Sequence, residues 1–171
     1  MDTVFGVSGI LLSIYGCITK SDVKFRILLG MACICLGIQL GLSLHFVGTI
    51  GYVITGLRLF SSIFLGKSLI AFLVFSLTQF GLSYYAFSSP IDILLMFSGV
   101  IGCYGAFFLS QEKLRMANVV VGVLQIAFNL LSNNLEGVIM ESIVIISCLI
   151  GAYNIRRFHA AENKLNDIKL G

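Results

Sequence analysis

The chain of 171 residues is 58% hydrophobic and only 11% charged. Because water-soluble domains carry charges on about a quarter of their residues, this composition excludes a soluble domain and predicts an integral membrane protein. We interpret the formal net charge of +3 as a consequence of membrane topology, and we expect no nucleic-acid partner.

Seven apolar segments follow one another along the chain, each near the ~20 residues that cross a bilayer as a helix. They are expected at residues 4–19, 26–44, 48–66, 68–87, 93–109, 114–132 and 137–155. The first lacks the basic start of a secretory signal peptide, so it is expected to stay as a membrane helix. The connections are short, and the residues after Arg157 are expected to form a tail that is compatible with a surface helix.

Basic residues gather in alternate connections, which sets the orientation because Lys and Arg accumulate on the cytoplasmic side. They lie in the first, third and fifth connections and in the tail, as Lys20, Lys24, Arg26, Lys67, Lys113, Arg115, Arg156, Arg157, Lys164 and Lys169. The other connections carry only acidic or neutral polar groups, and Arg58 alone lies well inside a segment. This pattern predicts an odd number of spans, with the N-terminus outside and the C-terminus inside.

The chain matches itself without a gap when it is shifted by 89 positions. The shift places Tyr15-Gly16 on Tyr104-Gly105, Ser21 on Ser110, Lys24 on Lys113 and Arg26 on Arg115. Segments 1–3 thereby fall on segments 5–7, and the fourth has no counterpart. We therefore predict an all-α fold of two parallel three-helix repeats joined by a linker helix, a 3-1-3 layout. The expected units are residues 1–67, 68–91 and 92–157, followed by a cytoplasmic tail at 158–171.

Two charged side chains inside the predicted helices require an explanation, because a charge at the bilayer centre costs about 2.5–3.5 kcal/mol on insertion scales. Arg58 lies near the middle of the third helix, and Glu141 lies in the outer third of the seventh. Either the two form a structural ion pair between the repeats, or Arg58 binds an anionic or polar group in a central cavity. In the second case Glu141 is its gate partner or a protonatable site. The sequence leaves both interpretations open.

Uncharged polar residues supply further candidates for a pathway through the bundle. Gln39 and Asn129 fall within one position of each other in the repeat, and Tyr52 takes the place of Glu141. Single amides in membrane helices usually form hydrogen bonds to a neighbouring helix, so a structural role is the alternative for each. The substrate-pathway candidates are Arg58, Glu141, Gln39, Asn129, Tyr52 and Gln125.

The sequence indicates no catalytic or cofactor chemistry. All five cysteines lie in apolar segments, where we expect them to pack rather than to form disulfides or a zinc site. These are Cys17, Cys33, Cys35, Cys103 and Cys148. Paired carboxylates, a metal-ligand set, a nucleophile with its base and a phosphate-binding loop are all lacking, so we expect no enzyme, cofactor or metal.

Several stretches of the chain are similar to a known family. Residues 48–58 (GTIGYVITGLR), with Gly66-Lys67-Ser68, resemble the third-helix pattern of the YgjV-type bacterial inner-membrane protein family. Residues 137–142, residues 154–158 and the basic loop at 19–26 are similar to it too. The resemblance covers essentially the whole chain and implies a multi-pass protein of the bacterial inner membrane. The 3-1-3 layout also resembles that of the SWEET sugar transporters and the PnuC vitamin transporters.

These expectations favour a small-molecule transporter or facilitator with its pathway between the two three-helix repeats. The expected partners are the lipid bilayer and an unknown small polar or anionic solute, and a homo-oligomer is compatible with the sequence. The alternative is a non-transporting membrane protein that is structural or binds a partner or lipid, with a structural Arg58–Glu141 pair. A water-accessible cavity at Arg58 would favour transport, whereas a closed contact between the two charges would favour the alternative.

Overall fold

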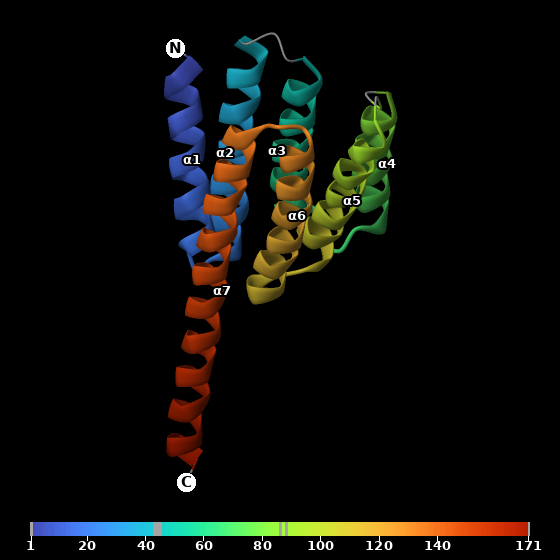
Figure 1. Cartoon of the computed structure of the whole chain (residues 1–171). Helices are drawn as coiled ribbons and strands as arrows, with labels where there is room; N and C mark the ends of the chain where they lie inside the picture. The colour runs from blue at the N-terminus through green and yellow to red at the C-terminus, as the bar shows by residue number, and fades with distance from the viewer. Residues whose placement is uncertain (1, 43–45, 86, 88, 171) are drawn as a thin grey trace.

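The computed structural model describes residues 2–42, 46–85, 87 and 89–170. Within these residues the chain forms seven α-helices and one short 3-10 helix (Figure 1). The α-helices are α1 (Asp2–Ile18), α2 (Asp22–Leu42), α3 (Phe46–Phe64), α4 (Leu69–Tyr85), α5 (Ile93–Phe108), α6 (Gln111–Leu131) and α7 (Leu135–Leu170), and the 3-10 helix η1 (Pro90–Asp92) leads into α5. The all-α prediction is confirmed, and six of the helices lie close to their predicted segments.

The last helix is much longer than its predicted membrane segment. α7 continues without a break to Leu170, and Figure 1 shows its C-terminal part projecting beyond the other helices. Neither glycine nor proline occurs between Gly151 and Leu170, so no helix-stopping residue separates the membrane part from the tail. Polar and charged residues replace the apolar ones after Ile155. The tail is therefore an extension of α7 rather than a separate element.

Length and composition suit a membrane environment. Four stretches of the described chain are long and apolar enough to cross a bilayer, namely Asp22–Leu42, Pro90–Phe108, Gln111–Leu131 and Gly137–Ala161. Three further apolar helices are shorter, at Val4–Ile18, Thr49–Phe64 and Leu69–Tyr85. Large apolar side chains such as Phe64, Ile70 and Leu77 are exposed on the outside of the bundle. A surface of this kind is unfavourable in water and is accommodated by lipid.

The helices pack mainly against their neighbours in the chain. α2 lies between α1 and α3, and α6 lies between α5 and α7. α4 packs chiefly on α5, where the Phe72 ring meets Phe108 and the Phe75 ring meets Phe107. α7 returns to lie beside α1 (Figure 1), which brings the two ends of the bundle together. We refer to α1–α3 as the first triplet and to α5–α7 as the second triplet.

A small buried core joins both triplets. It consists of Cys17, Phe25, Leu29, Cys33, Leu59, Ala106, Leu114 and Cys148. The sulfurs of Cys17 on α1 and Cys148 on α7 lie 3.0 Å apart as free thiols. Four of the five cysteines are buried and the fifth, Cys35, is partly buried, so they pack within the bundle as the sequence predicts.

Two equivalent arginines make reciprocal contacts between the triplets. Arg26 of α2 donates to the backbone carbonyls of Ala106 and Leu109 at the end of α5. Arg115 of α6 donates to the carbonyls of Cys17 and Thr19 at the end of α1. The last carbonyls of a helix have no intrahelical donor, so each guanidinium satisfies these acceptors and complements the helix dipole. Each triplet therefore caps the first helix of the other.

The shift of 89 positions that relates the two halves of the sequence also relates these contacts. It places Arg26 on Arg115, and it places Cys17 on Ala106. The equivalent residues Asp22 and Gln111 touch each other directly, since the Gln111 backbone N–H donates to Asp22 Oδ2 at 2.7 Å. Residues that the shift makes equivalent are therefore in contact with each other at this point of the bundle.

Candidate functional site

Arg58 is buried in the interior of the helix bundle. It projects from α3, is 7% exposed, and reaches across to α5 in the other triplet. Its Nη1 donates to the Gly99 carbonyl at 3.2 Å and lies 3.2 Å from the Cys103 sulfur. Both are neutral acceptors, and a thiol is a weak one. The positive charge of Arg58 is therefore solvated by dipoles only.

Three polar atoms in this region have no hydrogen-bond partner among the described residues. They are Nε of Arg58, Oε1 of Gln79 and Oγ of Ser76. Each is fully shielded from solvent, and leaving such a group unpaired costs about 1–3 kcal/mol. One donor and two acceptors of this kind, on neighbouring helices, mark the region as a polar site within an apolar bundle.

Close packing on α5 brings Arg58 and Gln79 to the same backbone segment, at Gly99 and Gly102. A methyl group added to Gly99 would lie 2.5 Å from Cγ of Gln79 on α4. The carbonyl of the same glycine accepts the hydrogen bond from Arg58. A methyl group added to Gly102, one turn along α5, would lie 2.9 Å from Nη2 of Arg58. Glycine at both positions allows the two polar side chains to approach the α5 backbone.

Ser76 lies three residues before Gln79, so the two side chains share one face of α4. Ser76 is 9% exposed, and its hydroxyl can both donate and accept a hydrogen bond. We name Arg58, Ser76, Gln79, Gly99 and Cys103 the Arg58 cluster. It combines a planar cation with neutral donors and acceptors, which are groups suited to a carboxylate, a phosphate or another polar anion.

A second polar contact lies within the second triplet. The carboxylate of Glu141 on α7 faces Gln125 on α6, and the Gln125 amide nitrogen, oriented toward it, donates to the two carboxylate oxygens at 3.0 and 3.1 Å. The amide orientation follows from this hydrogen-bond pattern. One of the two interpretations drawn from the sequence was a structural ion pair between Arg58 and Glu141. The two side chains form no direct ion pair. The only ion pair within the described ranges joins Arg115 to Asp22.

Arg58 and Glu141 nevertheless both lie near the Cys33 thiol in the interior of the bundle. The Cys33 thiol of α2 interacts electrostatically with both charges. Tyr52 of α3 interacts with Glu141 and packs against the buried core. Both charges are therefore near Cys33, and they form no ion pair with each other.

The remaining predicted candidates lie at other helix contacts. Gln39 of α2 faces α1, because a methyl group added to Gly6 would lie 2.6 Å from its amide oxygen. Asn129 lies in the last turns of α6, where its side chain accepts a hydrogen bond from the Asn134 amide at 2.9 Å and packs on Gly137 of α7. The structure thus brings Gln125 and Glu141 together, places Asn129 one turn away at the same α6–α7 contact, and places Gln39 at the α1–α2 contact.

Apart from Gly99, which has no side chain, the sequence interpretation missed three members of the Arg58 cluster. Gln79 and Ser76 belong to the fourth segment, which has no counterpart in the repeat and was therefore not compared with another helix. Gln79 is the one amide in that segment, and this was the available signal. Cys103 was assigned to packing, and it does pack, but its sulfur also faces the Arg58 guanidinium.

Metal binding finds no support in the part of the chain that the structure describes. Among those residues no group of three His, Cys, Asp or Glu side chains gathers at metal-binding distance. The Arg58 cluster offers a positive charge and hydrogen-bonding groups for binding.

Comparison with known proteins identifies the family. No curated protein and no solved structure matches the chain. The sequence pattern of the Imp-YgjV family, described as bacterial inner membrane protein, matches residues 1–160. This range contains α1 to α6, most of α7, the Arg58 cluster and the Glu141–Gln125 contact. The chain belongs to the Imp-YgjV family of bacterial inner membrane proteins.

Proposed function

We propose that this protein is a transporter or facilitator of a small polar or anionic solute in the bacterial inner membrane. The solute passes between the two triplets, and Arg58 binds its anionic or polar group. The proposal includes seven spans with the N-terminus outside, in a 3-1-3 layout. The reciprocal Arg26 and Arg115 contacts and the contact between Asp22 and Gln111 support this layout.

One observation carries the proposal: among the described residues, the buried Arg58 has no anionic partner and an unpaired Nε, and it packs on the same α5 glycine as Gln79, whose oxygen is also unpaired. An arginine inside a membrane bundle is costly and is retained where it serves function or structure. A structural role would be expected to satisfy its donors, because a partly satisfied buried network destabilises the fold. A solute that offers both acceptors and a donor satisfies the Arg58 cluster.

The surroundings of the Arg58 cluster suit a pathway. Arg58 crosses from the first triplet to α5 of the second, so a group bound to it lies at their interface. Toward the end of α5 the same interface is closed by Arg26, which bonds Ser62 of α3 at 2.6 Å and the α5 carbonyls. In alternating access, two helix bundles move relative to each other and open the binding site to one side of the membrane at a time. A site closed at one end by hydrogen bonds between the two triplets is compatible with this mechanism. Glu141 adds a protonatable group that interacts with the same interior region.

Metabolite profiling of a deletion strain, combined with point variants, tests the proposal. The deletion strain is complemented with the wild-type protein, Arg58→Lys, Gln79→Leu or the control Thr78→Val. Lysine keeps the charge but lacks the planar fork that pairs with carboxylate or phosphate. Thr78 neighbours Gln79 in sequence, but its side chain is exposed and bonds its own helix, so its replacement leaves the Arg58 cluster intact.

The expected result is a solute whose level changes in the deletion strain and is restored by wild type and Thr78→Val only. Membrane fractions must contain the four proteins at equal amounts for the comparison to hold. Full restoration by both Arg58→Lys and Gln79→Leu would contradict a solute site at the Arg58 cluster. A non-transporting role would instead leave intracellular and extracellular solute levels unchanged by the deletion.

A further inference from the structure

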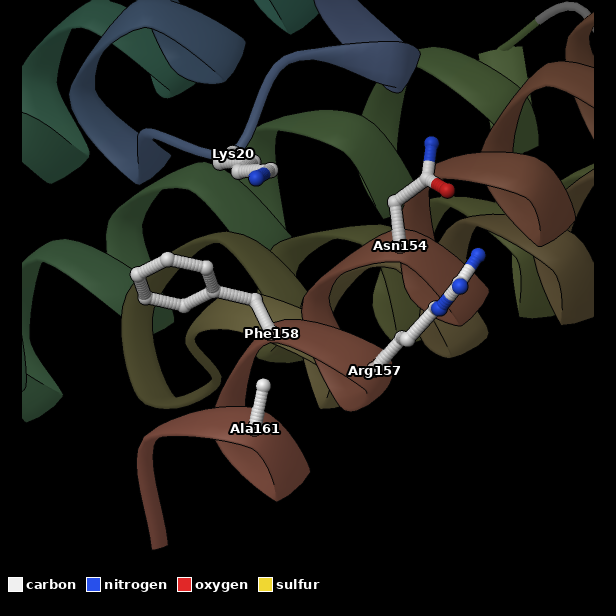
Figure 2. Close-up of a pocket in the computed structure, with 5 residues that line it drawn as sticks. All are labelled: Lys20, Asn154, Arg157, Phe158 and Ala161. Carbon is white, nitrogen blue, oxygen red and sulfur yellow. The ribbon is translucent and has the colours of Figure 1, made fainter. Parts of the chain in front are cut away.

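A second site lies at the opposite side of the molecule from the α3–α5 interface, where the α1–α2 connection meets α7. A pocket of about 300 Å³ opens there, lined by Lys20, Asn154, Arg157, Phe158 and Ala161 (Figure 2). Lys20 comes from the connection, and the other four come from two successive turns of α7. Lys20 and Phe158 form one side of the pocket, and Asn154 and Arg157 form the other, as Figure 2 shows.

The lining residues of the pocket have the charge that suits an anion. Two of the five are cationic, one is an amide, and none is acidic. The Lys20 ammonium lies 4.6 Å from the centre of the Phe158 ring, and this contact positions the charge without neutralising it. Arg157 adds a planar guanidinium, whose geometry matches two oxygens of one phosphate group. The pocket therefore offers a phosphate group cations from two sides and an amide donor from a third residue.

The position of the pocket favours a phosphate that belongs to a lipid. Lys20 follows the end of α1, and the four α7 residues lie in the last part of the apolar stretch Gly137–Ala161, where basic residues begin. Because Lys and Arg gather where membrane helices meet the cytoplasmic surface, we infer that the pocket lies at that surface. α1 and α7 are in contact, and their outer surfaces toward the bilayer carry exposed apolar side chains. These are Tyr15 and Ile18 on α1 and Leu149, Ile150 and Tyr153 on α7. Acyl chains can lie along this surface while the headgroup reaches the basic pocket.

From this geometry we propose that the pocket of Lys20, Asn154, Arg157, Phe158 and Ala161 binds the phosphate headgroup of an anionic phospholipid. The lipid lies against the contact between α1 and α7 and holds the start of the projecting part of α7 to the bundle. This site is independent of the solute pathway proposed above, since none of its residues belongs to the Arg58 cluster.

Lipid retention by the purified full-length chain tests this site. The protein is stripped of lipid in neutral detergent, and the probes are phosphatidylglycerol, phosphatidylcholine and inorganic phosphate. Bound lipid is counted by native mass spectrometry, and protection is read as a shift in the thermal midpoint. Each basic residue at an anionic surface contributes about a fivefold gain in affinity, so Lys20→Gln with Arg157→Gln should weaken phosphatidylglycerol binding ~25-fold.

A matched control removes the same charge elsewhere. Lys67→Gln with Lys113→Gln replaces two exposed lysines that do not line the pocket, and it should bind phosphatidylglycerol as the wild type does. Ala161→Glu offers a second test that keeps both cations, because it adds a carboxylate to the pocket wall on an exposed helix position. It should also reduce binding. Since all these positions are exposed or on a helix surface, the variants are expected to fold.

Two outcomes would overturn the proposal. Undiminished phosphatidylglycerol binding by both the Lys20/Arg157 variant and Ala161→Glu would place the lipid elsewhere. Equal protection by inorganic phosphate and by phosphatidylglycerol, lost in the same variants, would show a pocket for a free anion rather than a lipid. The lipid assignment requires stronger protection by phosphatidylglycerol than by either phosphatidylcholine or inorganic phosphate.

Discussion

Arg115 and Arg58 are both buried arginines that reach from one triplet to the other, yet their surroundings differ. Arg115 is fully buried and uses Nε, Nη1 and Nη2 to donate to α1 carbonyls, to its own helix and to the Asp22 carboxylate. Its guanidinium also lies 4.8 Å from the centre of the Phe25 ring. Arg58 uses Nη1 for two neutral acceptors, and its Nε has no partner in the described chain. The contacts of Arg115 connect the two triplets and stabilise the fold. Arg58 keeps a hydrogen-bond donor that a bound group could use.

The difference follows from where each arginine meets its neighbour. Arg115 meets the end of α1, where the last carbonyls lack intrahelical donors and are free to accept. Arg58 meets the middle of α5, where the Gly99 carbonyl already accepts a hydrogen bond within its helix. Backbone alone can therefore satisfy an arginine at a helix end but not one at mid-helix. An arginine kept at mid-helix requires another partner, and we propose that the partner is the solute.

The largest effect is expected from Arg115→Met. Its removal leaves two helix-end carbonyls without their donor and leaves the Asp22 carboxylate with the Gln111 N–H but no cation. Breaking a buried ion pair in this way costs about 3–5 kcal/mol. Because Asp22 keeps some access to water, we expect the lower end of this range. For a chain of this size the thermal midpoint should fall by roughly 10 °C. Size-exclusion chromatography after heating in detergent measures this shift.

The control for Arg115→Met is Lys113→Gln, which removes an exposed charge two residues away and should change the midpoint little. If the thermal midpoint of Arg115→Met falls no further than that of Lys113→Gln, the Arg115 contacts contribute nothing to stability. That result would contradict the structural role that we assign to Arg115.

A smaller loss is expected from Arg26→Met, the equivalent change in the first triplet. Arg26 bonds Ser62 and two α5 carbonyls, but none of these acceptors is charged. Hydrogen bonds to a charged donor contribute about 1.5–3 kcal/mol each, and the carbonyls left behind remain near a helix end where water can reach them. We expect a loss of about 2 kcal/mol, which is less than for Arg115. An equal or larger loss would indicate that the Asp22 pair is not the source of the difference.

The sequence predicts the all-α fold and the approximate positions of the helices correctly, because local apolar pattern decides them. It does not distinguish Arg26 and Arg115 from the exposed lysines of the same connections, because all of them follow the distribution expected of cytoplasmic charges. Their burial depends on which helix end lies opposite. That contact joins residues about 80 to 98 positions apart in the chain and is fixed only by packing.

The partners of Glu141 and Arg58 could not be predicted from the sequence either. Both residues stand out because a charge inside an apolar helix is costly. Periodicity does not reveal whether they face each other, and in the structure Glu141 bonds Gln125 while Arg58 faces α5. Gln125 was a candidate by residue type alone. Gln79 required the packing of α4 on α5, which no repeat or loop charge could indicate.

Arg58→Met tests whether Arg58 has a binding role rather than a structural one. We expect a smaller effect on stability than for Arg115→Met. Replacing an incompletely bonded buried charge by an apolar side chain of similar length is often neutral or stabilising. We expect the unfolding free energy to change by less than about 1 kcal/mol, or to rise, while complementation of the deletion strain is lost. Combining it with Glu141→Leu should preserve this outcome. A midpoint that falls as far as in Arg115→Met would assign Arg58 a structural role.

The smallest effect is expected from Gly102→Ala, which shifts Arg58 without removing it. The added methyl group would lie 2.9 Å from Nη2, so the guanidinium must move by a few tenths of an ångström. Gly81→Ala on α4 is the matched control, because a methyl group there meets no atom within 4 Å. Both changes gain about 1 kcal/mol of helix propensity. Gly81→Ala should keep this gain and full activity, whereas Gly102→Ala should keep less of it and transport more slowly. If the two variants behave alike in thermal midpoint and in complementation, the position of the Arg58 guanidinium is not what the function depends on.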